Sequence, residues 1–181
     1  MSEDGRWSTW KKIRVLFALF ILLMVHFVFV LTRLGVIGLF KVTSGSMEPT
    51  LQIGDVIFID SQSIPDRFDI IAFPDPNHPE DLPLVKRIVG VGGDVIEVQG
   101  GILLINGEEQ YSRHIKGNRI NWKDVKVKVP FDQVFVLGDN RNDSYDSLNF
   151  GTVPLDSIKG KLTYILWPAD RRGKVDDFEE K

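Results

Sequence analysis

The sequence predicts an all-β domain of antiparallel sheets with barrel-like closure, preceded by one N-terminal transmembrane helix. An uncharged apolar run, Val15 to Leu31, indicates the helix. Beyond residue 40, short stretches rich in Val, Ile and Phe alternate with Gly, Pro, Asp and Asn, which is the pattern of strands and turns. No stretch in that part of the chain shows a convincing helical period, so we expect a mainly β fold.

The apolar run is long enough for a retained membrane anchor. As a helix, Val15–Leu31 extends about 26 Å at ~1.5 Å per residue, and apolar flanks lengthen it to 13–34, enough for a ~30 Å hydrocarbon core. Arg14 and Arg33 can extend toward the interfaces. A cleavable signal peptide would have a shorter core of ~7–15 residues and a small-x-small site close behind it. A core helix of a soluble protein would show a polar face, which is missing here.

Basic residues before the run favour a cytoplasmic N-terminus and an extracytoplasmic remainder. They are Arg6, Lys11, Lys12 and Arg14, against Arg33 and Lys41 behind the run. His26 lies near mid-span, where a neutral histidine without an acidic partner is more often tolerated than functional, and its role stays open. The expected organisation is a short tail (1–12), the helix (13–34), the β domain (35–170) and a charged tail (171–181).

Composition excludes several function classes. The 181 residues carry a net charge of −3, so nothing suggests a nucleic-acid partner. Cysteine is absent, which excludes disulfides, thiol catalysis and Cys-based zinc sites. We expect no metal, no cofactor and a monomeric protein.

Eight stretches read as strands because they are β-branched or aromatic and end at turn residues. They are 55–60, 69–73, 84–91, 94–98, 102–105, 125–129, 133–138 and 161–167. Within "EVQGGILLINGEE", Gly-Gly and Asn-Gly predict two successive tight hairpin turns. We expect the region 95–130 to form a small accessory hairpin region.

Three further stretches carry chemistry. In "SGSMEPTL" (44–51), Gly45 allows close backbone approach, Ser46 follows it and Pro49 fixes the turn, as an exposed serine nucleophile would require; an ordinary turn is the alternative. In "LPLVKRIVGVGGD" (82–94), Lys86 lies within an apolar strand. Burial there could lower its pKa from ~10.4 towards 7–8, which corresponds to roughly 3–5 kcal/mol of differential desolvation. A Lys86 that faces solvent fits the periodicity equally well.

The third stretch is the polar loop "GDNRNDSYDSLNFG" (138–151). Its density of Asp and Asn suggests Asx turns. Calcium binding is a weaker alternative, because the spacing of a calcium-binding helix-loop-helix is missing.

Together, "SGSMEPTL", "LVKRIVGVGGD" and "VLGDNRNDSYDS" resemble the sequence boxes of bacterial type I signal peptidases, in the right order and behind the right anchor. The resemblance covers roughly residues 40 to 167. It implies a serine endopeptidase of the bacterial cytoplasmic membrane with a Ser/Lys dyad and an all-β catalytic domain. Its substrates would be exported pre-proteins, cleaved after small residues at −1 and −3.

The resemblance also implies a role for each matching residue. Ser46 would be the nucleophile and Lys86 the general base, and the Ser46 amide with the Ser44 hydroxyl would form the oxyanion hole. Ser144 would orient Lys86 through a neutral hydroxyl, which perturbs the lysine pKa less than a carboxylate would. Structural support would come from charged residues that pair with one another: Arg87, Asp139, Arg141 and Asp146.

Two features depart from the family pattern or extend it. Leu148 stands where the family usually has an arginine for Asp146, so we expect Asp146 to pair with Arg141 or Arg87 instead. The apolar segment 34–40 could form a membrane-grazing strand that leads into the octapeptide 44–51 and holds it near the bilayer.

Other readings remain open. A Ser/His/Asp protease would need His78 or His114, and both histidines lie in polar, surface-like segments. Self-cleaving repressors also use a Ser/Lys dyad but need no anchor. A non-catalytic, membrane-tethered β module that binds exported chains would need neither Ser46 nor a neutral Lys86. A specialised role in processing one secreted substrate is a further possibility.

Overall fold

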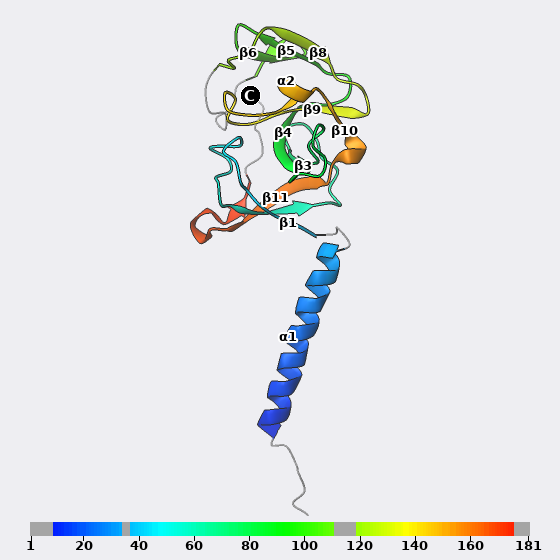
Figure 1. Cartoon of the computed structure of the whole chain (residues 1–181), viewed down its shortest axis with the longest axis vertical. Coiled ribbons are helices and arrows are strands. Elements are labelled where there is room, and N and C mark those ends of the chain that lie inside the picture. The colour runs from blue at the N-terminus through cyan, green and yellow to red at the C-terminus, as the bar shows by residue number, and fades with distance from the viewer. Residues whose placement is uncertain (1–8, 34–36, 111–118, 176–181) are drawn as a thin grey trace, which may run out of the picture. The chain divides into compact units, whose positions relative to one another are not determined.

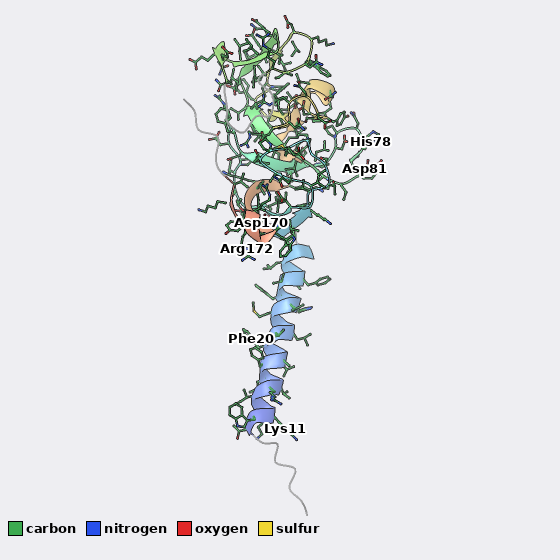
Figure 2. The ribbon with its side chains drawn as sticks, turned by 90° about the vertical axis from the view of Figure 1, so that its left-hand side faces the viewer. Lys11, Phe20, His78, Asp81, Asp170 and Arg172 are labelled. Carbon is green, nitrogen blue, oxygen red and sulfur yellow. The ribbon has the colours of Figure 1, made fainter. Side chains whose placement is uncertain are left out.

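The computed structural model describes residues 9–33, 37–110 and 119–175, and the chain divides into two compact units, residues 1–37 and 38–181. The first unit contains the helix α1 (Thr9–Arg33), whose Thr9–Leu31 stretch is long and apolar enough to cross a membrane. Its side chains, Lys11 and Phe20 among them, project all round the helix without an internal core (Figure 2). Such a helix needs an apolar environment of its own.

The second unit is built on an eight-stranded sheet with the order β1-β2-β11-β3-β4-β9-β10, and β12 pairs with β11 (Figure 1). Its strands are β1 (Ile37–Lys41), β2 (Val56–Asp60), β3 (Ile70–Phe73), β4 (Leu84–Gly90), β9 (Gln133–Leu137), β10 (Val153–Pro154), β11 (Gly160–Trp167) and β12 (Gly173–Lys174). The pairings from β2 through β10 are antiparallel, and register shifts interrupt β11 and β4. The predicted all-β class is therefore confirmed, with the sheet as an open half-barrel.

A second sheet, with the order β7-β6-β5-β8, lies within residues 95–128 and is called the accessory sheet below. Its strands are β5 (Val95–Gln99), β6 (Ile102–Ile105), β7 (Glu108–Glu109) and β8 (Val125–Lys128). Both expected hairpin turns are present, and Asn106 and Gly107 take φ values of 54° and 85°. These left-handed values explain why Asn-Gly stands at that turn. Within the β unit, this sheet lies at the end opposite β1 and β11 (Figure 1).

Three buried clusters hold the β unit together. One lies between the accessory sheet and β9, and includes Ile96, Leu103 and Leu137. A second packs Met47 and Leu51 against side chains of β2, β3 and β11. The third joins β3, β4 and β9. The second cluster matters most for function, because it fixes the turn that follows Ser46.

Several short elements were not predicted. They include β10, β12, the one-turn helix α2 (Ser147–Phe150) and the 3-10 helices η1 (Leu155–Ser157) and η2 (Ala169–Arg171). The segment expected as a charged tail begins with Arg171 paired to Asp55 and continues into β12. Elements of two to four residues are too short to show a hydrophobic period in the sequence. Their positions depend on tertiary contacts instead.

Candidate functional site

Ser46 lies on a tight turn whose two sides are both anchored. Behind it, Met47 and Leu51 are buried in the core, and the Leu51 amide donates to the Met47 carbonyl at 2.9 Å. In front, Asn140 donates its amide to the Ser46 carbonyl at 3.0 Å and its side chain to the Gly45 carbonyl at 3.1 Å. The loop 138–146 therefore holds the Ser46 turn directly.

Lys86 reaches Ser46 from β4, where it pairs with Ile71 of β3. Its Nζ lies 2.7 Å from Ser46 Oγ and 3.1 Å from the Val85 carbonyl oxygen. The side chain is only 3% exposed, so the apolar strand buries Lys86 rather than presenting it to solvent. The structure thus brings together the two residues that the sequence selected for a dyad.

Burial sets the acid–base character of Lys86. Desolvation lowers the pKa of Lys86 from 10.5 to about 8, against the opposing fields of Asp146, Asp139 and Asp75. A substantial fraction of the amine is therefore neutral near pH 8. A neutral amine at hydrogen-bond distance from a hydroxyl can accept its proton.

Ser44 lies beside the dyad, with its Oγ 3.3 Å from Ser46 Oγ. An apolar cavity of about 400 Å³ opens at this point, and Ser44, Ser46 and Lys86 contribute to its wall. The remaining lining comes mainly from β1, the Ser46 turn, Ile57, the segment before β4 and the start of β4, including Leu39, Phe40, Met47, Leu82 and Leu84. An extended apolar peptide segment could bind here next to the serine hydroxyl.

Ser144 was expected to donate to Lys86 or to accept from it, and the structure shows no such hydrogen bond. Within the described residues, Ser144 Oγ is buried and has no hydrogen-bond partner. A Cβ at Gly138 would overlap both this hydroxyl and the Ser46 carbonyl, so only glycine fits there. Ser144 therefore packs close to the Ser46 turn, while its orienting role stays a prediction.

Arg87 and Asp139 form a buried pair next to the dyad. Arg87 donates to Asp139 from Nε at 2.8 Å and from Nη2 at 2.7 Å, and its Nη1 donates to the Phe68 carbonyl at 2.8 Å. Thr50 Oγ1 donates to the same carboxylate at 2.5 Å. This bidentate geometry compensates the Asp139 charge close to Lys86.

The prediction that Asp146 pairs with an arginine is wrong. Asp146 caps α2: its side chain accepts from the Leu148 amide at 3.1 Å and from the Gly138 amide at 3.0 Å. Asn149 completes a capping box. Backbone N–H groups at a helix start can satisfy a buried carboxylate, so no cation is required. Leu148 itself packs against the accessory core.

The prediction that Arg141 pairs with Asp146 is wrong for the same reason. Its side chain is buried, and no ion pair to Asp139, Asp146 or another described carboxylate lies within 4.0 Å. Burial lowers the pKa of Arg141 to about 10, although Asp139 and Asp146 oppose that shift. The guanidinium Nε has no hydrogen-bond partner within the described chain.

Sequence reasoning missed Thr50, Asn140 and Asp75. Thr50 and Asn140 stand within the quoted stretches, but their roles depend on contacts between segments some ninety residues apart. Asp75 is buried near Lys86 and acts on it through space. Of the two histidines considered for a triad, His78 is exposed beside Asp81 (Figure 2), and His114 lies outside the described residues.

A buried lysine held against a serine hydroxyl, beside an apolar cavity in an all-β unit, indicates a serine hydrolase. The family model of signal peptidase, peptidase S26, matches residues 12–167. The chain therefore belongs to the signal peptidase (peptidase S26) family, and it is a serine endopeptidase.

Three relatives with 34–37% sequence identity agree with this assignment. A probable signal peptidase I-2 of Synechocystis is 37% identical over 152 residues, which cover 77% of this chain and 67% of the relative. Signal peptidase I of Bacillus caldolyticus is 37% identical over 153 residues, covering 75% and 82%. A probable thylakoidal processing peptidase 2 of Arabidopsis thaliana is 34% identical over 150 residues, covering 77% and 41%. A signal peptidase I crystal structure from Enterococcus faecalis aligns with a TM-score of 0.47 and 35% identity, covering 56% and 98%.

Proposed function

We propose that the chain is a membrane-anchored signal peptidase that cleaves exported pre-proteins with Ser46 as nucleophile and Lys86 as general base. The observation that carries the proposal is the 2.7 Å contact between Lys86 Nζ and Ser46 Oγ. The cavity beside this pair offers an apolar surface for the residues before the scissile bond. The resemblance implies that small side chains stand at −1 and −3.

The reaction begins with proton transfer. Neutral Lys86 takes the Ser46 proton while Ser46 Oγ attacks the scissile carbonyl carbon. The Ser46 amide and the Ser44 hydroxyl then donate to the developing oxyanion. Collapse of the tetrahedral intermediate breaks the C–N bond, and protonated Lys86 gives its proton to the leaving amine. Water, deprotonated by Lys86, hydrolyses the acyl-enzyme and releases the signal peptide.

The remaining residues act around this centre. Ser144 would orient Lys86 through its hydroxyl, which is buried and has no competing hydrogen-bond partner within the described chain. Arg87, Asp139, Arg141 and Asp146 would hold that loop and the neighbouring strands. No step of this mechanism requires a metal or a cofactor.

We further propose a single-pass arrangement in the cytoplasmic membrane of a bacterium. The α1 helix is apolar enough to span a bilayer, and the basic residues before it favour a cytoplasmic N-terminus. The β unit would then lie on the extracytoplasmic side, where exported pre-proteins present their cleavage sites. Protease protection of the β unit in inverted vesicles tests the orientation.

The test of the chemistry is cleavage of a pre-protein with an Ala-x-Ala site by the purified full-length protein in detergent. Ser46→Ala, Lys86→Ala and Lys86→Arg should each lower kcat by about 10²–10⁴-fold or more without unfolding the protein. Arginine keeps the charge but cannot be deprotonated. Lys128→Arg, on the exposed face of β8, is the matched control. An active Lys86→Arg enzyme would remove Lys86 from the mechanism.

A further inference from the structure

The C-terminal part of the described chain reaches back to the turn that carries Ser46. Arg171, at the end of η2, donates from Nε to Asp55 Oδ1 at 3.0 Å and from Nη2 to Asp55 Oδ2 at 2.9 Å. The same Nη2 donates to the Thr50 carbonyl oxygen at 3.0 Å. One side chain therefore contacts both ends of the segment 50–55, which begins four residues after Ser46.

Asp55 is the charged partner in this contact. Its side chain is 1% exposed, and its Oδ2 also accepts from the Gln52 amide at 2.9 Å. The hydrogen bond to Asp55 raises the pKa of Arg171, so the guanidinium is charged at every working pH. Removing Arg171 would leave a buried carboxylate without its cation, which strongly favours rearrangement of the segment around it.

Thr50 joins this contact to the dyad. Its carbonyl accepts from Arg171, while its hydroxyl donates to Asp139, the carboxylate that Arg87 holds from β4. Arg87 directly follows Lys86 on that strand. A continuous series of hydrogen bonds thus runs from Arg171 through Thr50 and Asp139 to the strand of the general base. Thr50 is held from both sides, so its peptide has little freedom to shift.

We propose that Arg171 is a positioning residue for peptide-bond cleavage. By fixing the Thr50 peptide, Arg171 keeps the turn 46–51 in register with β4, so that Ser46 Oγ stays at hydrogen-bond distance from Lys86 Nζ. The inference rests on the proposed roles of Ser46 and Lys86. Arg171 does not line the cavity next to the dyad. Its loss should therefore slow turnover of bound substrate more than it weakens binding.

The experiment measures kcat and KM for the full-length protein in detergent, with a pre-protein carrying an Ala-x-Ala site. Arg171→Ala should lower kcat about tenfold or more, because small misplacements of reacting groups are costly, while KM stays within about twofold. Arg171→Lys should recover part of the loss, since an ammonium group can pair with Asp55 but cannot reproduce the fork that also holds Thr50.

Arg172→Ala is the matched control and should behave as wild type. It removes the same charge one position later, and Arg172 is exposed with a long hydrogen bond of 3.4 Å to the Leu166 carbonyl. Each rate is divided by the concentration of folded protein, which circular dichroism measures. All assays are run at a temperature below the lowest unfolding midpoint among the variants. A variant Arg171→Ala that melts earlier but keeps its kcat would show a purely structural role and overturn the proposal. An equal loss in Arg172→Ala would overturn it as well.

Two further variants test the proposal if Arg171→Ala fails to fold or if the dyad itself is wrong. If Arg171→Ala does not fold, kcat of Arg171→Lys decides, and a wild-type value overturns the proposal. Ser46→Ala is assayed in parallel to separate this inference from the proposed function. Activity in Ser46→Ala would overturn the dyad itself, whereas an inactive Ser46→Ala with normal turnover in Arg171→Ala would overturn only the role of Arg171.

Discussion

At the scale of single residues, the state of Lys86 results from two opposing effects. Burial disfavours its charged form, while Asp146, Asp139 and Asp75 favour it, and burial is the larger effect. The structure explains why the carboxylates do not prevail. Asp139 is compensated by Arg87, and Asp146 accepts backbone hydrogen bonds, so both charges are already engaged before they act on the amine.

The first prediction concerns the pH dependence of catalysis. Because only neutral Lys86 accepts the Ser46 proton, kcat/KM should rise with pH along a single limb with a midpoint of about 8. Activity is lost as pH falls through that value and is retained above it. Initial rates between pH 5 and about 10 measure the limb. A profile that stays flat over this range would contradict a buried base.

The second prediction is that Lys86→Met stabilises the protein while inactivating it. The pKa of Lys86 is about 8 in the folded state and near 10.5 when unfolded, so the unfolded chain binds more protons between these values. Wild-type stability should therefore rise with pH across that interval. Methionine avoids the free-energy cost of burying a charged amine. After subtraction of the hydrogen bond that the substitution removes, the net gain in the free energy of unfolding is on the order of 2 kcal/mol below pH 8.

Denaturant unfolding of both proteins at pH 7 and at about pH 10.5 measures this effect. The advantage of Lys86→Met should be largest at the lower pH and shrink at the higher one. Lys128→Met, at an exposed position, should show no such pH-dependent gain. A Lys86→Met variant that is less stable than wild type at pH 7 would mean that Lys86 is better solvated than its burial indicates.

At this scale the resemblance of the three sequence boxes to a family pattern selected Ser44, Ser46 and Lys86, and the structure places these three side chains next to one another. It could not identify the partner of Asp146. Opposite charge suggested an arginine, but the carboxylate instead meets amides that become available only when α2 begins and when β9 ends beside it. Asp is a favoured N-cap residue, but a helix of one turn shows no period in the sequence that would mark its start.

At the scale of elements, the main strands were predictable, whereas the one-turn helices and the two-residue strands β10 and β12 were not. All eight predicted stretches contain strands. Buried and more exposed residues alternate in some of them, such as β2 and β5, whereas β3 is buried throughout and was recognisable from its β-branched and aromatic residues. The turns at Gly100-Gly101 and Asn106-Gly107 were equally clear. By contrast, α2 consists of one turn and exists because Asp146 and Asn149 cap it.

The third prediction follows from that cap. Asp146→Ala should destabilise the protein by roughly 2–3 kcal/mol, because it removes the cap of α2 and leaves the buried Gly138 amide unpaired. It should also lower kcat, since the same loop carries Ser144 and Asn140. Unfolding by denaturant and steady-state kinetics measure the two effects.

Two comparison variants make this prediction specific. Asp143→Ala, at an exposed site of the same loop, should be nearly silent. Leu148→Ala should cost roughly 1–2 kcal/mol through lost apolar contact with the accessory core, with little effect on kcat. If Asp146→Ala were silent in both measurements, the capping contacts would contribute nothing to stability or to the site.

At the scale of the whole molecule, the chain combines an apolar helix with a β unit that has its own cores. The reacting groups, the cavity and Arg171 all belong to the β unit. Its chemistry therefore needs no residue of α1. In the proposed function, the helix would hold the β unit at a membrane, and its length and apolar composition are those of a membrane span. Sequence hydropathy predicts the helix itself, because an uncharged apolar run of this length is typical of a membrane span.

The fourth prediction separates anchoring from catalysis. Removing residues 1–33 should leave a folded β unit that still cleaves peptides and still binds lipid vesicles. Leu39 and Leu82 line the cavity and are 49% and 71% exposed, so they form an apolar rim beside the dyad. Leu39 lies on β1, the strand that the sequence predicted to graze the membrane. An exposed apolar rim of this kind favours contact with lipid.

Vesicle flotation and peptide cleavage, with and without lipid, measure the two properties of the truncated protein. Replacing Leu39 and Leu82 by Glu should weaken vesicle binding, because each charge would have to enter the interface. Ile64→Glu is the matched control, since Ile64 is 92% exposed but does not line the cavity. A truncated protein that ignores vesicles, and cleaves peptide equally well without them, would show that α1 alone provides the membrane contact. Equal losses of binding in the Leu variants and in Ile64→Glu would show that lipid binding is not localised at the cavity.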